Sequence, residues 1–375
     1  MTNTQTLQTT PFHAYHLSEG AKMVDFAGWD MPLHYGSIID EHHQVRKSGG
    51  LFDVSHMGRI RFTGKDACRL LDRLYTRQIL GMADGQARYS LVCNEQGGCH
   101  DDVLVNCISE TEYLMVCNGA NREKINQHIQ ANKGDYICKV SDETEFTAML
   151  ALQGPKIMDI IIGISSEVPN LKRYRFTVKN LFIASVMISR TGYTGEDGVE
   201  IILPKSFANK AIEMMLANLP DKTVITPAGL GARDSLRLEA GMPLYGHELN
   251  EEIDPISAGL QFAVKLDKGI GENEAEPFIG QEALQQIAEN GPAQKLVGLT
   301  LDGRRSPRQG MNVVLPYDTR CKIGEVTSGC FSPTFEKPIA MAYVDSGVNV
   351  GNEVMIDFGR TQLPASIAPL PFYKR

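Results

Sequence analysis

Apolar and polar residues follow one another along the first part of the chain in two patterns, strand-like runs and helix-like stretches. Short apolar runs predict strands over 59–62, 87–93, 103–108 and 112–117. Apolar positions three or four residues apart predict helices over 38–47, 66–75 and 121–132. A glycine turn at 94–98 predicts a hairpin, whereas 22–57, dense in Gly, Asp, His and aromatic residues, predicts ordered loops around its helix.

The second part of the chain begins with a strand over 182–189, the loop RTGYTGEDG and a strand over 199–203, which together predict a hairpin with a long turn. Helical spacing predicts a helix from Ser206 and another from Pro227 to Gly241, since proline suits the first helical position. The stretch 268–281 has no period, and we expect it to be a connection outside the main core. A helix over 281–289 then precedes a series of short strands, over 295–301, 312–315, 324–327, 340–344, 353–358 and 362–367. Such a series is typical of a small β-barrel or sandwich.

Length and composition narrow the class of protein. A chain of 375 residues exceeds one ordinary core and predicts two or three domains, at roughly 150 residues per domain. The net charge of -8 leaves no basic stripe, so we expect no nucleic-acid partner. The polar start MTNTQTLQTT resembles no signal peptide, and the longest apolar run, 181–188, is too short to cross a bilayer. We therefore expect a soluble protein with no membrane partner, cytoplasmic, or from an organelle matrix if a transit peptide has been removed.

Cysteine, histidine and glycine patterns exclude the common metal and cofactor sites. The eight cysteines show no CxxC spacing, so reduced thiols and no metal site are expected. GxGxxG, GxxxxGK[ST], GxSxG and HExxH are all absent from the sequence. His42 and His43 are expected to be surface or capping residues, because adjacent helix positions point about 100° apart, and His100 is expected to be solvated.

The adjacent carboxylates Asp101 and Asp102 follow the glycine turn at the start of a predicted strand. Successive strand residues point to opposite faces, so one carboxylate should point inward and the other toward solvent or a loop. The inward carboxylate is therefore the candidate for chemistry.

Glu200 lies within the apolar run VEIIL, where an isolated charge needs a partner. Arg233 and Arg237, one turn apart on the last predicted helix of this region, can supply one. A plain salt bridge and a ligand site are equally compatible with these residues. A pocket built from Asp101, Glu200 and an arginine would suit a neutral, nitrogen-rich ligand such as a pterin, with Tyr89 or Tyr193 covering its ring.

Five long motifs resemble, in order, the glycine cleavage system T-protein family of aminomethyltransferases. They are MVDFAGWDMPLHYGSIIDEHHQVRKSGGLFDVSHMG, YSLVCNEQGGCHDDVLV, RTGYTGEDGVEI, GLGARDSLRLEAGMPLYG and GEVTSGCFSPTFEKPIAMAYV. The resemblance implies a tetrahydrofolate-dependent enzyme that takes an aminomethyl group from the lipoyl arm of H protein. It releases ammonia and forms 5,10-methylenetetrahydrofolate, with tetrahydrofolate and lipoylated H protein as its partners.

The resemblance also implies roles for particular residues. The family's catalytic aspartate falls on Asp101, where it would orient a folate nitrogen, stabilise a cationic transition state and move a proton; Asp102 would be structural. The substrate-binding glutamate and arginine fall on Glu200 and Arg233. Weaker pocket candidates are Asn118 and Tyr89, with Tyr193 as a candidate to cover the ring and Tyr373 or Arg375 for a C-terminal binding residue. Glu196 is expected in a turn or at the rim, with an exchange of roles with Glu200 left open.

The fold implied by the resemblance is α+β, a three-domain cloverleaf-like arrangement with a central folate channel and a C-terminal β-barrel. Residues 11–265 would form two interleaved α+β domains, and 290–370 the barrel. Two positions depart from the family pattern. His100 replaces a branched apolar residue and could change the polarity beside Asp101; Gly49 replaces an alanine and is expected to affect only backbone freedom.

Relatives on this scaffold supply two alternative functions. One is a folate-dependent demethylase of a methylated amine or sulfonium compound, which H protein would not stimulate. The other is a non-enzymatic folate-binding regulator that carries a cysteine in a KGCYxGQE-like segment. This chain has EPFIGQEAL at that place and no cysteine there, which makes the regulator the weaker alternative.

Overall fold

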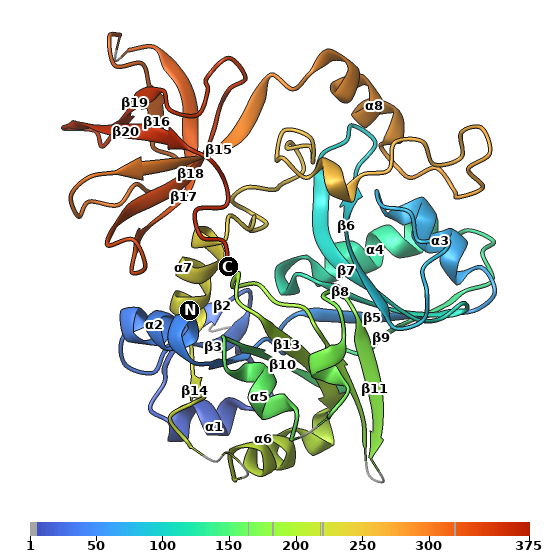
Figure 1. Cartoon of the computed structure of the whole chain (residues 1–375). Helices are drawn as coiled ribbons and strands as arrows, with labels where there is room; N and C mark the ends of the chain where they lie inside the picture. Colours follow the sequence, from blue (N-terminus) through green and yellow to red (C-terminus); the bar gives the residue numbers. More distant parts are fainter. Residues whose placement is uncertain (1–5, 164, 182–183, 218, 220, 319) are drawn as a thin grey trace.

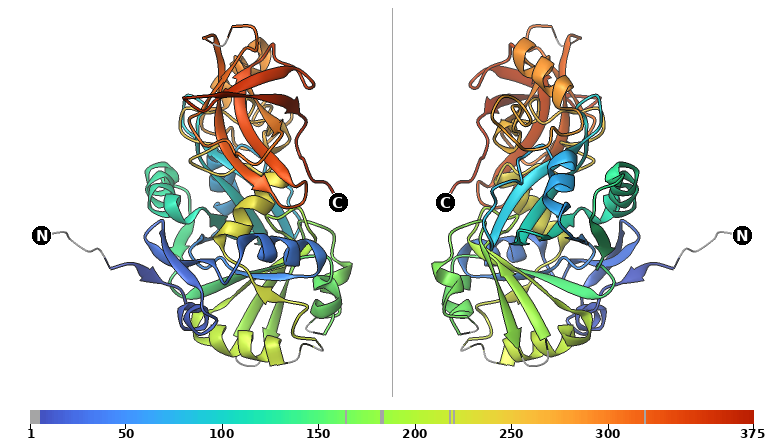
Figure 2. Two further views of the ribbon diagram at one scale, coloured as in Figure 1. Left: turned by 90° about the vertical axis from the view of Figure 1, so that its left-hand side faces the viewer. Right: turned by 90° about the vertical axis from the view of Figure 1, so that its right-hand side faces the viewer.

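The computed structural model describes residues 6–163, 165–181, 184–217, 219, 221–318 and 320–375. The chain forms three lobes, two built on open sheets and one on a closed barrel (Figure 1). The two side views show the barrel at one end of the molecule and the green strands of the second sheet at the other (Figure 2). The predicted three-lobed α+β fold with a C-terminal barrel is confirmed, whereas the central channel stays a prediction.

The first lobe is an antiparallel sheet of order β6-β7-β8-β5-β9, covered by helices on one face. Its strands are β5 (Gly58–Thr63), β6 (Gln86–Cys93), β7 (Cys99–Ser109), β8 (Glu112–Cys117) and β9 (Lys139–Asp142). Its helices are α3 (Ala67–Leu74), η1 (Gly119–Asn121) and α4 (Arg122–Lys133). Cys93, Cys107 and Cys117 are buried among the apolar residues of this lobe.

The second lobe is a six-stranded sheet of order β11-β12-β13-β10-β4-β14. Its strands are β4 (Gly50–Asp53), β10 (Thr147–Gln153), β11 (Phe176–Leu181), β12 (Ala184–Ser189), β13 (Gly198–Pro204) and β14 (Thr226–Pro227). Its helical segments are α5 (Ile157–Ile161), η2 (Val168–Asn170), η3 (Lys205–Phe207) and α6 (Ala208–Ala217). The chain leaves this sheet after β4, builds the whole first lobe and returns at β10, so the two lobes are interleaved.

Several N-terminal elements and one long helix lie beside this sheet. A small sheet of order β1-β3-β2 comes from β1 (Gln8–Thr9), β2 (Lys22–Phe26) and β3 (Trp29–His34), with α1 (His13–Ser18) and α2 (Ile38–Lys47) beside it. Helix α7 (Leu230–Glu239) packs against α2, β3 and the barrel strand β17, and so joins two lobes (Figure 1).

The third lobe is a closed barrel of order β15-β18-β17-β16-β19-β20. Its strands are β15 (Gln294–Leu301), β16 (Asn312–Val314), β17 (Lys322–Ser332), β18 (Lys337–Asp345), β19 (Glu353–Asp357) and β20 (Gln362–Ala368). Alternate residues of these strands fill its interior. The alternative of a sandwich is therefore wrong, and η4 (Gln261–Ala263) and α8 (Gln281–Asn290) lie in the segment leading to the barrel.

Three sequence expectations need correction, and a fourth lies partly outside the described residues. The segment 22–57 contains strands β2, β3 and β4 as well as α2, so it is not mainly loops. The two helices expected from Ser206 and Pro227 begin at Ala208 and Leu230, since Pro227 belongs to β14. The strand expected over 182–189 is described only from Ala184, because 182–183 lie outside the described residues.

The segment 268–281, expected outside the core, is packed against the first lobe. Lys268 has no exposed surface, and its Nζ donates to the carbonyl of Tyr75 at 2.8 Å and lies 3.1 Å from Asp72 Oδ1. Phe278 and Ile279 are also buried. The segment lacks periodicity because single side chains, rather than a regular face, attach it to the core.

Candidate functional site

The two adjacent aspartates at the start of β7 point to opposite faces of the sheet, as strand alternation predicts. Asp101 shares with Val103 and Val105 the buried face that packs under α3 and α4, and it has no exposed surface. Asp102 shares with Leu104 the opposite face, which meets the core of the second lobe, and Asp102 remains partly exposed. The inward carboxylate thus enters a closed core, and the accessible one lies between lobes.

An asparagine joins the two carboxylates. Asp101 accepts hydrogen bonds from the Asn118 backbone N–H at 3.0 Å and from its Nδ2 at 2.8 Å. The Nδ2 of Asn121 donates to Asp101 at 2.6 Å. Asn118 Nδ2 also lies 2.9 Å from Asp102 Oδ1, and the Tyr89 hydroxyl donates to Asp102 Oδ2 at 3.2 Å. We call Asn118 and Asn121 the amide cradle of the acid pair.

Burial and mutual repulsion keep the acid pair partly protonated. Desolvation, and then the charge of Asp102, raise the pKa of Asp101 to about 8, although the amide cradle opposes the shift. Burial also raises the pKa of Asp102. Two carboxylates in such contact cannot both ionise easily, so the pair can hold and release a proton near neutral pH.

The raised pKa of Asp101 predicts how stability depends on pH. An unfolded chain releases this proton above about pH 4 and the folded chain only near pH 8, so the folded state binds more protons between these values. Stability from this group is therefore full at low pH and declines as pH rises through that window, by up to about 1.4 kcal/mol per pH unit. Asp101→Asn should flatten this decline in urea unfolding measured from pH 4 to 8. An unchanged slope would show that Asp101 is ionised throughout.

Aromatic side chains surround the accessible carboxylate. Tyr89 stacks on Phe262 with ring centroids 6.0 Å apart and an interplanar angle of 22°. The Arg233 guanidinium lies 4.8 Å from the centroid of the Tyr193 ring. Burial first, with a contribution from the charge of Asp102, raises the pKa of both tyrosines, although both keep some exposed surface. Desolvated side chains with accessible surface are typical of the walls of a narrow recess.

Arg233 has an unsatisfied hydrogen-bonding group. Its Nη1 is buried and has no hydrogen-bond partner among the described residues, and burial lowers its pKa. Glu200 is near enough for its charge to oppose that shift, yet its Oε2 accepts from the Thr191 hydroxyl at 2.5 Å and no Arg233–Glu200 ion pair is found in the described ranges. Arg237 instead pairs with buried Glu248 at 2.8 Å. Of the two alternatives, the arrangement at Arg233 favours a ligand.

The C-terminal tail forms a separate ionic group. Arg375 Nη1 lies 3.1 Å from Glu196 Oε2, and Arg46 Nη1 lies 3.1 Å from Glu196 Oε1. The Arg46 guanidinium lies 3.9 Å from the centroid of the Tyr373 ring. Glu196 lies in the bend of the glycine loop, as expected of a turn residue, but it is buried and not at the rim. Arg375 therefore anchors the tail to the glycine loop, and its role as a substrate ligand stays a prediction.

His42 is buried, contrary to the expectation of a surface or capping residue. Its Nδ1 lies 2.8 Å from Ser235 Oγ, and its Nε2 lies 3.0 Å from Thr334 Oγ1 and 3.2 Å from Glu239 Oε2. The sequence contained a sign of this burial, because His42 lies three residues before Val45 and both belong to the buried face of α2.

Two further positions differ from expectation. The His100 side chain is 19% exposed, lies 3.3 Å from Glu251 and packs its ring 4.9 Å from that of His128, so it is not simply solvated. A Cβ at Gly49 would lie 2.7 Å from Ile157 Cδ1 and 3.0 Å from the Val224 carbonyl. Gly49 therefore permits close packing, which matters more than backbone freedom.

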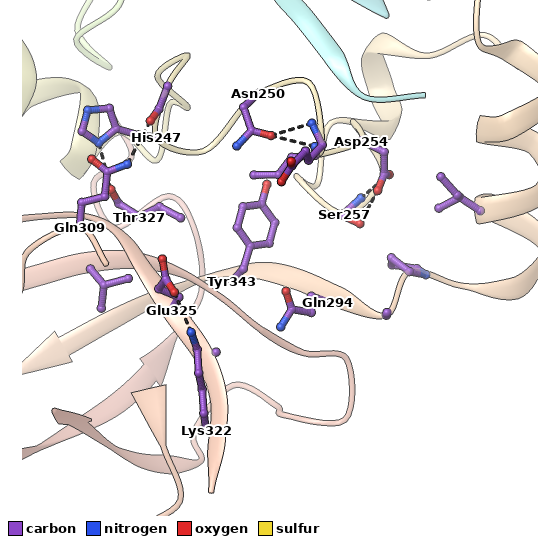
Figure 3. A pocket seen from close by; sticks show the side chains of 18 of the residues that line it. His247, Asn250, Asp254, Ser257, Gln294, Gln309, Lys322, Glu325, Thr327 and Tyr343 are labelled. Carbon is purple, nitrogen blue, oxygen red and sulfur yellow. Dashed lines mark hydrogen bonds and ion pairs between the residues drawn. The ribbon is translucent and has the colours of Figure 1, made fainter. Parts of the chain in front are cut away.

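A cavity of about 600 Å³ lies between the loop 246–257, the end of α8 and the barrel (Figure 3). None of the site residues predicted from the sequence lines it. Its polar side chains satisfy one another, as His247 does with the Thr327 carbonyl at 3.0 Å and Lys322 with Glu325 at 2.7 Å (Figure 3). The acid pair, the tyrosines and Arg233 are therefore the better candidate site.

The residues that the structure describes contain neither a metal-binding cluster nor a membrane span. In those ranges, no three His, Cys, Asp or Glu side chains gather as a metal ion would require. No helix there combines the length and apolar character needed to cross a bilayer.

Comparisons with known proteins match nearly the whole chain. The GCVT N-terminal domain matches residues 12–268, and the glycine cleavage T-protein C-terminal barrel domain matches residues 294–374. An aminomethyltransferase of Rubrobacter xylanophilus is 45% identical over 99% of this chain and 95% of its own length. One from Caldanaerobacter subterraneus is 42% identical over 98% of this chain and 96% of its own length.

A solved structure agrees with these matches. The glycine cleavage system aminomethyltransferase T from Bartonella henselae superposes with a TM-score of 0.90 and 32% identity, and covers 98% of both chains. Sequence, fold and domain order agree over both parts of the molecule. The chain therefore belongs to the glycine cleavage T-protein (GCVT) family.

Proposed function

We propose that this protein transfers the one-carbon unit of an aminomethyl group, carried on the lipoyl arm of H protein, to tetrahydrofolate. The products are ammonia, 5,10-methylenetetrahydrofolate and the reduced lipoyl thiol. The observation that carries the proposal is the similarity over nearly full length to proteins named aminomethyltransferase. Nothing comparable favours a demethylase or a folate-binding regulator.

The residues of the candidate site fit tetrahydrofolate. The unpaired Nη1 of Arg233 can bind an acceptor of the ligand, and Glu200 can accept N–H bonds from a nitrogen-rich ring edge. Tyr89, stacked on Phe262, and Tyr193 present flat faces to a ring. When bound, tetrahydrofolate supplies the two amine nitrogens that receive the one-carbon unit.

Proton movement is the step in which the acid pair can act. A C–S and a C–N bond break and two C–N bonds form, while two protons pass from amine nitrogens to the lipoyl sulfur and to ammonia. A group that exchanges a proton near neutral pH suits this transfer, and the raised pKa of Asp101 and of Asp102 gives the pair that property. The amide cradle holds both carboxylates in place while charge changes around them.

The structure supports Asp102 as the carboxylate that contacts substrate. Asp102 has exposed surface and lies beside Tyr89, whereas Asp101 has none and is enclosed by the amide cradle. We therefore assign substrate contact to Asp102. Asp101 has a supporting role, in which it influences the charge of Asp102. The assignment of catalysis to Asp101 from the sequence is the competing hypothesis.

The proposed function is tested by ammonia release from aminomethyl-loaded H protein, with and without tetrahydrofolate. We expect rapid release and formation of methylenetetrahydrofolate only when both are present. Methyl removal from a methylated amine without any effect of H protein would establish the demethylase instead. Folate binding without turnover of either substrate would indicate the regulator.

A further inference from the structure

His56 lies on the short segment that links β4 of the second lobe to β5 of the first. Its side chain is buried, with 4% of the residue exposed. The Arg59 guanidinium donates to the carbonyl of Ser55 at 3.0 Å and to that of Met57, the two residues on either side of His56. One buried guanidinium thus fixes the backbone on both sides of the histidine.

The His56 ring lies against Gly119, which lies in the sequence between the two residues of the amide cradle. A Cβ on Gly119, the residue after Asn118, would lie 3.2 Å from His56 Cδ2 and 2.5 Å from the His56 carbonyl oxygen. Only glycine therefore leaves room for the ring at this position. Phe26 packs edge-on against the ring at 5.3 Å between centroids, with an interplanar angle of 86°. Since Cδ2 is bonded to Nε2, the Nε2 edge is the one near the cradle.

Both nitrogens of His56 lack a protein partner. Nδ1 is buried and has no hydrogen bond among the described residues. Nε2 bonds to no described residue either, but it is not among the buried unpaired atoms and so keeps accessible surface. A buried N–H without an acceptor is more costly than an unused lone pair. The tautomer with its proton on Nε2 is therefore favoured, and it offers a donor at the accessible edge.

The surrounding charges keep this imidazole neutral. Burial lowers the pKa of His56 to about 4; the charges of Arg233 and Arg59 add to the shift, and that of Asp53 opposes it. The charge interaction with Arg233 indicates that His56 lies near this arginine as well as near Gly119. A neutral donor there can bind a neutral acceptor atom of a ligand without adding another charge to the site.

We propose that His56 is a further substrate-binding residue, whose Nε2–H donates to a carbonyl oxygen or ring nitrogen of a ligand held between the amide cradle and Arg233. The inference rests on the proposed function for the ligand, a reduced pterin. It adds a neutral hydrogen bond to the charged contacts of Arg233, Glu200 and the acid pair. Such a contact selects for a ring that carries an acceptor at this place.

Calorimetric titration of tetrahydrofolate into the full chain and two His56 variants tests the inference. Gln places its amide nitrogen near the position of Nε2, whereas Asn places it near that of Nδ1. His56→Asn should weaken tetrahydrofolate binding roughly tenfold, and His56→Gln should restore most of the affinity. His128→Gln is the matched control, because His128 is a half-buried histidine that also has a buried, unpaired ring nitrogen, Nε2, and a pKa lowered to about 4. It should bind as the unaltered chain does.

The possible outcomes separate this inference from the proposed function. If the unaltered chain does not bind tetrahydrofolate, the proposed function is wrong. If it binds and His56→Asn binds equally well, the role of His56 is wrong. If the Asn and Gln variants lose affinity for tetrahydrofolate equally, and both also have a lower melting temperature, the role of His56 is structural only.

Discussion

Replacing Asp102 by Asn should lower the rate of methylenetetrahydrofolate formation by about 10²–10⁴-fold, the range typical of a well-placed acid–base group. Asp102 is the member of the acid pair with exposed surface, and it accepts from the Tyr89 hydroxyl at 3.2 Å. An amide can still accept that bond, so the fold should be retained. Single-turnover rates with loaded H protein measure the effect, and near-ultraviolet circular dichroism checks the fold.

Asp101→Asn is the matched comparison at the next residue. It removes the group whose pKa is raised to about 8 and leaves Asp102 in place, so we expect a smaller loss of rate and the disappearance of any step near pH 8 from the pH–rate profile. The competing assignment makes the opposite prediction. If Asp101→Asn abolishes turnover while Asp102→Asn stays within a few-fold of the unaltered rate, catalysis belongs to Asp101.

Replacing Arg233 by Met should raise the KM for tetrahydrofolate roughly 10–100-fold without loss of stability. The expected size follows from hydrogen bonds to a charged group, at about 1.5–3 kcal/mol each. Stability should be unaffected because no described residue accepts a hydrogen bond from the buried Nη1, and methionine removes the cost of its desolvation. Steady-state kinetics and urea unfolding measure the two effects separately.

Arg237→Met, one turn further along α7, is the control, because this substitution should reduce stability. Arg237 pairs with Glu248, which has no exposed surface, at 2.8 Å and also bonds Ser328 of the barrel at 2.8 Å. Its loss leaves an uncompensated buried carboxylate, so the free energy of unfolding should fall by about 3 kcal/mol or more. A stability loss in Arg233→Met as large as this one would mean that Arg233 is structural.

Local patterns in the sequence correctly predicted the helices and strands whose inner and outer faces are set by residues within the element itself. Helix α2 has the predicted bounds, and the barrel strands follow the predicted series because alternation in a small barrel is set by each strand's inner and outer faces. The alternation at Asp101 and Asp102 was also correct. The sequence does not show which face of β7 packs against the helices of its own lobe and which face packs against the other lobe. The answer decides which of the two carboxylates is accessible.

The remaining errors concern partners distant in the chain. Glu196 is buried because Arg46 and Arg375 reach it from opposite ends of the sequence. His42 is buried because α7 and the barrel cover α2. Lys268 is held by carbonyls of the loop after α3. No window of neighbouring residues contains these pairs, so only tertiary packing reveals them.

The return of the chain from one sheet to the other has a mechanical consequence. Strand β4 is hydrogen-bonded on one side to β10 and on the other to β14, both of which follow the entire first lobe in sequence. A fragment ending before β10 would leave β4 with both edges unpaired, so the second lobe cannot complete its sheet until the first lobe has been made. The two crossings of the chain between the sheets, after β4 and before β10, therefore tie the carboxylates of β7 to the lobe beside which α7 and its arginine lie.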